Sequence, residues 1–321
     1  MRILLTTYHQ AFLTPAGGET ELHQLAEFMS DCGARADIYG PNSRRLSSYD
    51  AVVHFSTHGG GEGMLADINA AGKPVILIPN FNFFDQKHPS KSIVQRHLDL
   101  ADAVILRTEV EKTLCKNNFS VAENKLTVIP PGIPAAFGKL AEPNLFQTAY
   151  GLEKYALWVG QLAQHKRQLE AIEALSSLSL PLVMIGGHAD KKYYEQCRAA
   201  AGGNVRFLPY VQPASEILRS AMQSCSVYVE LGDDYPGFSA IEAALTGAPM
   251  VLNEHPWSRE ILGDFPVYTT RGSWEGLRET VESAAKNARM SDLARLARQK
   301  YLQPKPTAQI IDLIEQLLVG R

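Results

Sequence analysis

Long apolar runs, paired cysteines and an excess of one charge are all missing from this sequence. No apolar segment reaches about eighteen residues, so no transmembrane helix is predicted, and the start MRILLTTYHQ has no apolar stretch of signal-peptide length. The four cysteines are far apart and show no disulfide or zinc spacing. A formal net charge of −3 argues against nucleic acid as a partner. These absences favour a cytoplasmic protein.

The motifs of several other enzyme classes are missing as well. The sequence contains no H-E-x-x-H, no G-x-S-x-G and no G-x-x-x-x-G-K-[ST]. The glycine run at 59–63 lacks the full G-x-G-x-x-G register, and no acidic residue ends the next strand, so NAD is not expected. Asp233-Asp234 is not a D-x-D metal motif. We expect neither a metal nor a cofactor.

What the chain does contain is strand-length apolar runs that alternate with segments of helical period, the pattern of a parallel α/β fold. Its 321 residues favour two domains. The predicted strands are Ile3–Thr6, Ala36–Tyr39, Ala51–Phe55, Pro74–Ile78, Ala103–Leu106, Leu126–Ile129, Ala156–Val159, Leu182–Ile185, Val205–Phe207, Val227–Val229, Met250–Leu252 and Val267–Tyr268. The predicted helices are Glu21–Cys32, Ser92–Leu100, Glu109–Lys116, Arg167–Leu178, Lys191–Ala201, Ala214–Ser224, Ile241–Thr246 and Thr307–Leu318.

A Pro- and Gly-rich stretch from Pro130 to Pro143 separates two Rossmann-like halves, because it can sustain neither a helix nor a central strand. We therefore expect one domain over 1–140 and a second over 150–304.

Two segments of the second half suit a nucleotide diphosphate. In LWVGQLAQHKR (157–167) a strand ends at Gly160 and the basic pair Lys166-Arg167 follows. In YPGFSAIEAALTGAPMV (235–251) a loop leads into a small-residue helix that carries Glu242. Cations and helix N-terminal amides bind phosphates, and a carboxylate binds ribose hydroxyls.

These segments resemble the VGRL...K and E-x7-E motifs of the retaining GT-B glycosyltransferases of family 4. The resemblance implies two Rossmann-like domains that face a central cleft, with the C-terminal segment 305–321 crossing back to the N-terminal domain. It also implies transfer of a hexosyl unit from a nucleotide diphosphate sugar to an acceptor hydroxyl, with retention and without a metal. In that reaction the donor's own phosphate helps to deprotonate the acceptor.

The resemblance assigns roles to individual residues. Lys166 matches the family's lysine, whereas Gln161 stands where the family has a second cation, so Arg167 is the candidate to compensate. Gly17 and Gly18, in the first strand-to-helix loop, match a glycine pair that faces the diphosphate and the acceptor. The family's H-x-H places its second histidine near the donor sugar; here Ser56 is the strict match and His58 is the substitute.

The carboxylates leave two registers open. Glu242 matches the second Glu of E-x7-E, which holds the ribose, and eight residues earlier stands Asp234. The family's Y-E-G-F would instead place Pro236 on the first Glu. We prefer Asp234, and in either register Gly237 and the amides of residues 238–240 (Phe238, Ser239 and Ala240) can bind phosphate.

Two other functions are compatible with a GT-B fold. A nucleotide-sugar-binding protein that has lost transferase activity would explain Gln161 and Asp234. A GT-B-shaped epimerase or phosphorylase would need its own catalytic carboxylate or cofactor lysine, and neither is evident. The donor could be UDP-, GDP- or dTDP-linked, and the acceptor a glycan, a lipid-linked molecule at the inner face of a membrane or a small molecule.

Overall fold

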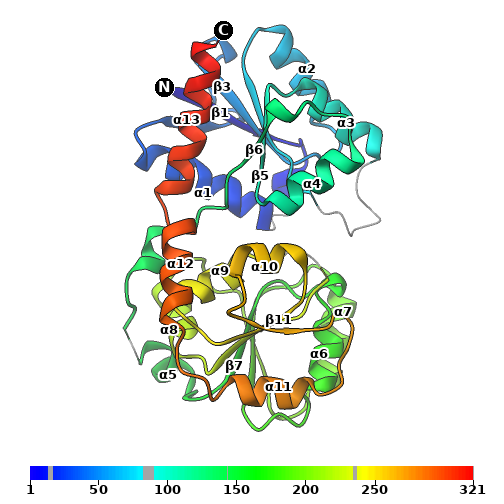
Figure 1. Cartoon of the computed structure of the whole chain (residues 1–321), viewed down its shortest axis with the longest axis vertical. Helices are drawn as coiled ribbons and strands as arrows, with labels where there is room; N and C mark the ends of the chain where they lie inside the picture. Colours follow the sequence, from blue (N-terminus) through cyan, green and yellow to red (C-terminus); the bar gives the residue numbers. More distant parts are fainter. Residues whose placement is uncertain (14–16, 82–89, 143, 234–236, 321) are drawn as a thin grey trace. The chain divides into compact units, whose positions relative to one another are not determined.

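The computed structural model describes residues 1–13, 17–81, 90–142, 144–233 and 237–320 (Figure 1). The chain forms two compact units. Unit 1 comprises Met1–Gly132 and Gln303–Arg321, and unit 2 comprises Ile133–Leu302. Residues 133–140 therefore belong to unit 2, and residues 303 and 304 to unit 1, in contrast to the expected boundaries.

The chain passes from unit 1 to unit 2 after Gly132 and returns to unit 1 after Leu302, and these two connections run side by side. In unit 2 the Ile133 amide donates to the Tyr301 carbonyl at 2.8 Å. In unit 1 Gly132 packs so closely on Gln303 that a Cβ at position 132 would lie 1.8 Å from the Gln303 Nε2 atom. The two connections between the units are therefore neighbours at the boundary.

Unit 1 is built on a parallel sheet of six strands in the order β2-β1-β3-β4-β5-β6 among the described residues. Its strands are short apolar runs that are largely buried on both faces, as parallel sheets require. They are β1 (Arg2–Thr7), β2 (Arg35–Ile38), β3 (Ala51–Phe55), β4 (Val75–Ile78), β5 (Ala103–Leu106) and β6 (Leu126–Val128).

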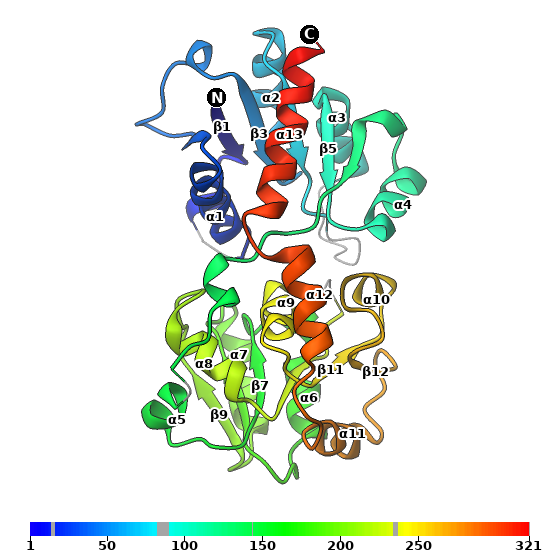
Figure 2. The same ribbon diagram turned by 60° about the vertical axis from the view of Figure 1, so that its left-hand side comes forward.

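Helices cover both faces of this sheet. On one face α1 (Gly17–Asp31) and α13 (Lys305–Val319) pack together over β1 and β3, as Figures 1 and 2 show. On the other face lie α2 (Glu62–Ala70), α3 (Lys91–Leu100) and α4 (Glu109–Asn118). The C-terminal helix thus completes the core of the first unit.

Unit 2 repeats the design with the strand order β12-β11-β10-β7-β8-β9, also parallel. Alternate residues of one strand enter opposite cores: Leu157 packs on one face and Trp158 on the other. The strands are β7 (Ala156–Val159), β8 (Leu182–Ile185), β9 (Val205–Leu208), β10 (Val227–Glu230), β11 (Met250–Asn253) and β12 (Val267–Thr269).

The first face of this sheet packs against α5 (Leu145–Tyr150), α8 (Glu216–Ser224), α9 (Phe238–Leu245), α10 (Pro256–Leu262) and α12 (Ser291–Tyr301). The second packs against α6 (Gln168–Ala174), α7 (Lys191–Ala200) and α11 (Leu277–Ala284). Figures 1 and 2 show α12 directly beside α9. Each helix thereby contributes buried apolar residues to one of the two cores, and α9 is buried over the whole of 240–245.

Every predicted strand is present, with ends that differ by at most one residue. The helices α2, α5, α10, α11 and α12 were not predicted, and α6 is shorter than expected because it starts after Arg167 and ends at Ala174. Among the described residues no helix combines the length and the apolar character that a membrane span needs.

Candidate functional site

The strand order of unit 2 creates one place where a ligand site is expected. Strand β7 lies between β8 and β10, so the connections that leave β7 and β10 run in opposite directions along the sheet. In open parallel sheets, ligands bind beyond the carboxyl ends of the strands at this switch point. The segments that follow β7 and β10 are the two that the sequence singled out.

Lys166 reaches this edge of the sheet from the β7 side. It ends the short 3-10 helix Gln164–Lys166, and its side chain is largely buried. Its Nζ atom lies 3.9 Å from Oε1 of Glu230, the last residue of β10. A cation and a carboxylate thus meet where the connections that leave these two strands run in opposite directions.

Glu230 was not predicted from the sequence. Its side chain is 5% exposed, and its carboxylate accepts a hydrogen bond from the Tyr228 hydroxyl at 2.7 Å and one from the Gly237 amide at 3.0 Å. The strand-end position of a glutamate within V-Y-V-E was the available signal, but only the pairing of β10 with β7 places it beside Lys166.

Helix α9 brings Glu242 and its own N-terminus to the same region. Gly237 precedes the first helical residue, and Phe238, Ser239 and Ala240 form the first turn, where the helix dipole favours anions. The Ala240 amide donates to the Gly237 carbonyl at 3.1 Å, which closes this turn.

Glu242 is buried on the second turn of α9. Burial, and then the negative charge of Glu230, raise the pKa of the Glu242 carboxyl to about 8. The raised pKa favours the protonated form of this carboxyl, which can donate one hydrogen bond as well as accept others.

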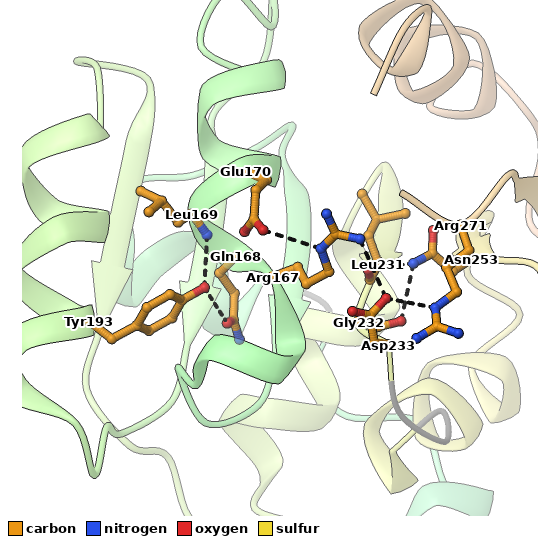
Figure 3. A network of polar contacts seen from close by, with 10 residues as sticks. All are labelled: Arg167, Gln168, Leu169, Glu170, Tyr193, Leu231, Gly232, Asp233, Asn253 and Arg271. Atoms are coloured by element: carbon orange, nitrogen blue, oxygen red, sulfur yellow. Dashed lines mark hydrogen bonds and ion pairs between the residues drawn. The ribbon is translucent and has the colours of Figure 1, made fainter. Parts of the chain in front are cut away.

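Arg167 is directed into a separate network, shown in Figure 3. Its backbone is left-handed (φ 57°), and its guanidinium donates to Glu170 at 3.2 Å and pairs with Asp233 at 3.5 Å. Arg271 donates to the same Asp233 carboxylate at 2.8 Å. The ring of Trp274 lies under the Arg167 guanidinium, 5.0 Å from its centre. The predicted donor-binding cation is thus held by contacts within the protein.

Gln161 is exposed, and its contribution to this network is made by its backbone. Its carbonyl accepts from Gln168 Nε2 at 2.9 Å, and the buried Gln168 also contacts Tyr193 (Figure 3). A close approach of two strands lies beside this turn: a Cβ at Gly186 would lie 2.0 Å from the Gly160 carbonyl oxygen. Gly186 also has φ 157°, so glycine is required there.

The other predicted residues lie in unit 1. Gly17 and Gly18 open α1, and a Cβ at Gly18 would contact the Phe55 ring at 3.2 Å. His58 is exposed after β3, and its Nδ1 atom makes a short contact with the Ser56 hydroxyl. Tyr8 links these parts: its ring lies 5.1 Å from that of His58, and its hydroxyl donates to Glu19 of α1 at 3.0 Å.

His54, the first histidine of the H-x-H comparison, lies inside unit 1. It is fully buried, and its Nδ1 atom bonds with the Thr6 hydroxyl at 2.8 Å. Burial, followed by the nearby His97, lowers the pKa of His54 to about 3. His54 is therefore a neutral core residue.

Some predicted positions lie outside the described residues: Thr14 to Ala16, Asn82, and residues 234–236, which include Asp234 and Pro236. Neither carboxylate register is decided by the structure. Among the residues that the structure does describe, no group of three or more His, Cys, Asp and Glu side chains is arranged to hold a metal ion.

Comparisons with known proteins match the second unit to a protein family and the whole chain to solved structures. Residues 146–302, just under half of the chain, match the model of the family described as glycosyl transferases group 1. No match was found among the curated proteins.

Solved structures resemble the whole chain. The sucrose-phosphate synthase of Thermosynechococcus elongatus is 14% identical, with 100% of both chains covered and a TM-score of 0.83. Anabaena HepE in complex with UDP and glucose is 16% identical over 98% of this chain and 99% of its own, with a TM-score of 0.76. A glycosyltransferase of Rickettsia africae is 11% identical over 99% of this chain and 98% of its own, with a TM-score of 0.75. The chain has the GT-B fold of such glycosyltransferases, and residues 146–302 match the glycosyl transferases group 1 family.

Proposed function

We propose that this protein is a retaining glycosyltransferase that moves a hexosyl unit from a nucleotide diphosphate sugar to an acceptor hydroxyl without a metal. The observation that carries the proposal is the convergence of Lys166, Glu242 and the N-terminus of α9 at the switch point of the unit 2 sheet. The family match covers the same segment. The resemblance to HepE, solved with UDP and glucose, supports a nucleotide sugar as the donor.

In this proposal the diphosphate lies at the first turn of α9, where backbone amides and the helix dipole favour negative charge. Lys166 then stabilises the charge that develops on the departing nucleotide. Glu242 binds the ribose hydroxyls, as donor and acceptor in its protonated form. Each group acts on a different part of the same donor.

Retention and metal independence rest on the family resemblance and on the cation available. A lysine can supply the positive charge that a divalent ion supplies elsewhere, and the donor phosphate can accept the acceptor proton. His58, on unit 1, is proposed to contact the donor sugar. Gly17 and Gly18 would allow the diphosphate and the acceptor close access to the backbone.

The test begins with binding. Thermal-shift screening with UDP, GDP, dTDP and their sugars should reveal a stabilising nucleotide. A ligand at a hundredfold its Kd adds about 2.7 kcal/mol to the apparent free energy of unfolding. Donor consumption is then measured with glycan, lipid-linked and small-molecule acceptors, with and without a chelator. NMR of the anomeric proton of the product shows whether configuration is retained. Inversion of configuration, or loss of activity in the chelator, would contradict the corresponding part of the proposal.

A second candidate is a nucleotide-sugar-binding protein without transferase activity. It is favoured by the uncharged and exposed Gln161 and by the contacts that hold Arg167 away from a second cationic role. Tight nucleotide binding without donor turnover on any acceptor would support it.

A further inference from the structure

Glu230 has an arrangement that neither the family resemblance nor the sequence motifs explain. It is the last residue of β10, and its carboxylate is almost completely buried at the edge where the proposed donor site lies. Burying a carboxylate is unfavourable unless other groups compensate its charge. The groups that contact the Glu230 carboxylate therefore indicate its role.

The two carboxylate oxygens contact three different elements. Oε2 accepts from the hydroxyl of Tyr228, which is itself fully buried, and this bond fixes the carboxylate at the strand end. Oε1 accepts from the amide of Gly237, which precedes α9. The same Oε1 lies 3.9 Å from the Lys166 ammonium. One oxygen thus faces both the lysine and the start of the helix.

We propose that Glu230 is a positioning residue that holds Lys166 and, through the Gly237 amide, the start of α9 in the geometry in which they bind the donor diphosphate. This inference rests on the proposed function. The rigid strand end anchors the carboxylate, and the carboxylate restricts the rotamers of a long lysine side chain. Because Gln161 stands where the resembling family has a second cation, the placement of Lys166 should have more effect here than in a site with two.

A residue that acts through Lys166 has a distinct kinetic signature. Glu230→Gln keeps an oxygen that can accept from Gly237 but removes the charge that attracts the ammonium. The variant should lose about tenfold in kcat, because misplacing a catalytic group by a fraction of an ångström weakens the transition state. KM for the donor should change less than threefold, since removal of a negative charge near the diphosphate does not weaken ground-state binding.

A double-mutant cycle separates positioning from a general structural role. In the Lys166→Ala background, Glu230→Gln should cause no further loss of kcat, because the group it positions is gone. Glu254→Gln is the matched control: it also removes a carboxylate from an ion pair of unit 2, with Arg259, and should leave kcat and the cycle unchanged. Additive losses in the double variant, or an unchanged kcat in Glu230→Gln, would overturn the proposal.

A measurement without nucleotide keeps this inference separate from the proposed function. The rate at which acetic anhydride acylates Lys166 can be followed by peptide mass spectrometry on the wild-type protein and on Glu230→Gln. It should rise about threefold or more in the variant, because the ammonium loses the carboxylate that holds it. An equal rate in both proteins would show that Glu230 does not position Lys166, whether or not the chain transfers sugars.

Discussion

The guanidinium of Arg167 lies over the ring of Trp274, 5.0 Å from its centre, while its remaining contacts go to carboxylates of the same unit. This stacking stabilises the guanidinium through the ring quadrupole. The two adjacent basic residues therefore have different surroundings: Lys166 faces Glu230, whereas Arg167 contacts Trp274 and the carboxylates of Glu170 and Asp233.

Arg167→Ala should therefore affect stability more than catalysis. We expect the free energy of unfolding to fall by about 1 kcal/mol, the usual contribution of partly exposed ion pairs and a cation–π contact. Urea denaturation measures this loss, and initial rates should show kcat within about threefold of wild type. Arg271→Ala is the control: it removes the other cation that pairs with Asp233 and should also leave kcat within about threefold of wild type. A loss of about a hundredfold in kcat would instead make Arg167 the leaving-group cation.

Lys166→Ala should lower kcat on the order of a hundredfold or more, by analogy with the loss of a single donor to a developing anion. The effect on KM should be smaller, because the lysine acts mainly in the transition state. Steady-state kinetics with the identified donor provide the measurement. Gln161→Arg, which restores the family's second cation, should keep or raise activity. A near wild-type rate in Lys166→Ala would remove the lysine from the mechanism.

Glu242→Ala should weaken nucleoside diphosphate binding roughly tenfold to a hundredfold, because the ribose hydroxyls lose their partner in a closed site. Isothermal titration calorimetry at neutral pH measures the change. Glu242→Gln is the matched variant: an amide donates and accepts as a protonated carboxyl does, so its affinity should stay within a few-fold of wild type. Equal affinity in a folded Glu242→Ala protein would exclude the ribose role.

The burial of Glu242 also predicts a pH dependence of stability. Its pKa is about 8 in the folded protein and 4.5 in its ordinary state, so between these values the folded protein holds a proton that the unfolded chain has released. The free energy of unfolding should consequently fall as pH rises from about 4.5 to 8. Glu242→Gln stays neutral and should lack this decline. Urea denaturation at pH 5 and pH 8 compares the two proteins, and parallel curves would show that Glu242 titrates normally.

Gly186→Ala should destabilise unit 2 severely, by about 2 kcal/mol or more, because steric overlap adds to an unfavourable backbone conformation. The added Cβ would lie 2.0 Å from the Gly160 carbonyl oxygen. Gly187→Ala provides the control, because a Cβ there meets nothing within 4 Å. Thermal unfolding of both variants tests this comparison, and equal melting temperatures would contradict it.

The alternation of strands and helices was predictable because strands buried on both faces are continuous apolar runs. Several missed helices also carried a signal. In α12, Leu293, Ala297 and Tyr301 recur at four-residue spacing and are buried, and Pro256 stands at the start of α10, where proline favours a helix. Helix α2 was hidden by the glycine run that precedes it.

The site was only partly predictable for a different reason. Lys166 and Glu242 follow recognisable local patterns, so their placement at one sheet edge could be expected. The role of Arg167 depends on Asp233 and Trp274, which are distant in sequence. The proximity of Glu230 to Lys166 depends on strand order, and strand order is not written in any local pattern.

The packing of α13 in the core of unit 1 has a consequence for synthesis on the ribosome. Ile310, Ile311 and Ile314 bury themselves among β1, β3 and α1, yet they are translated after all of unit 2. Unit 2 is one continuous segment and can fold once it has emerged. Until α13 has been made, the first 132 residues have only α1 among the described helices to cover this apolar sheet face, so the part made first is the part finished last.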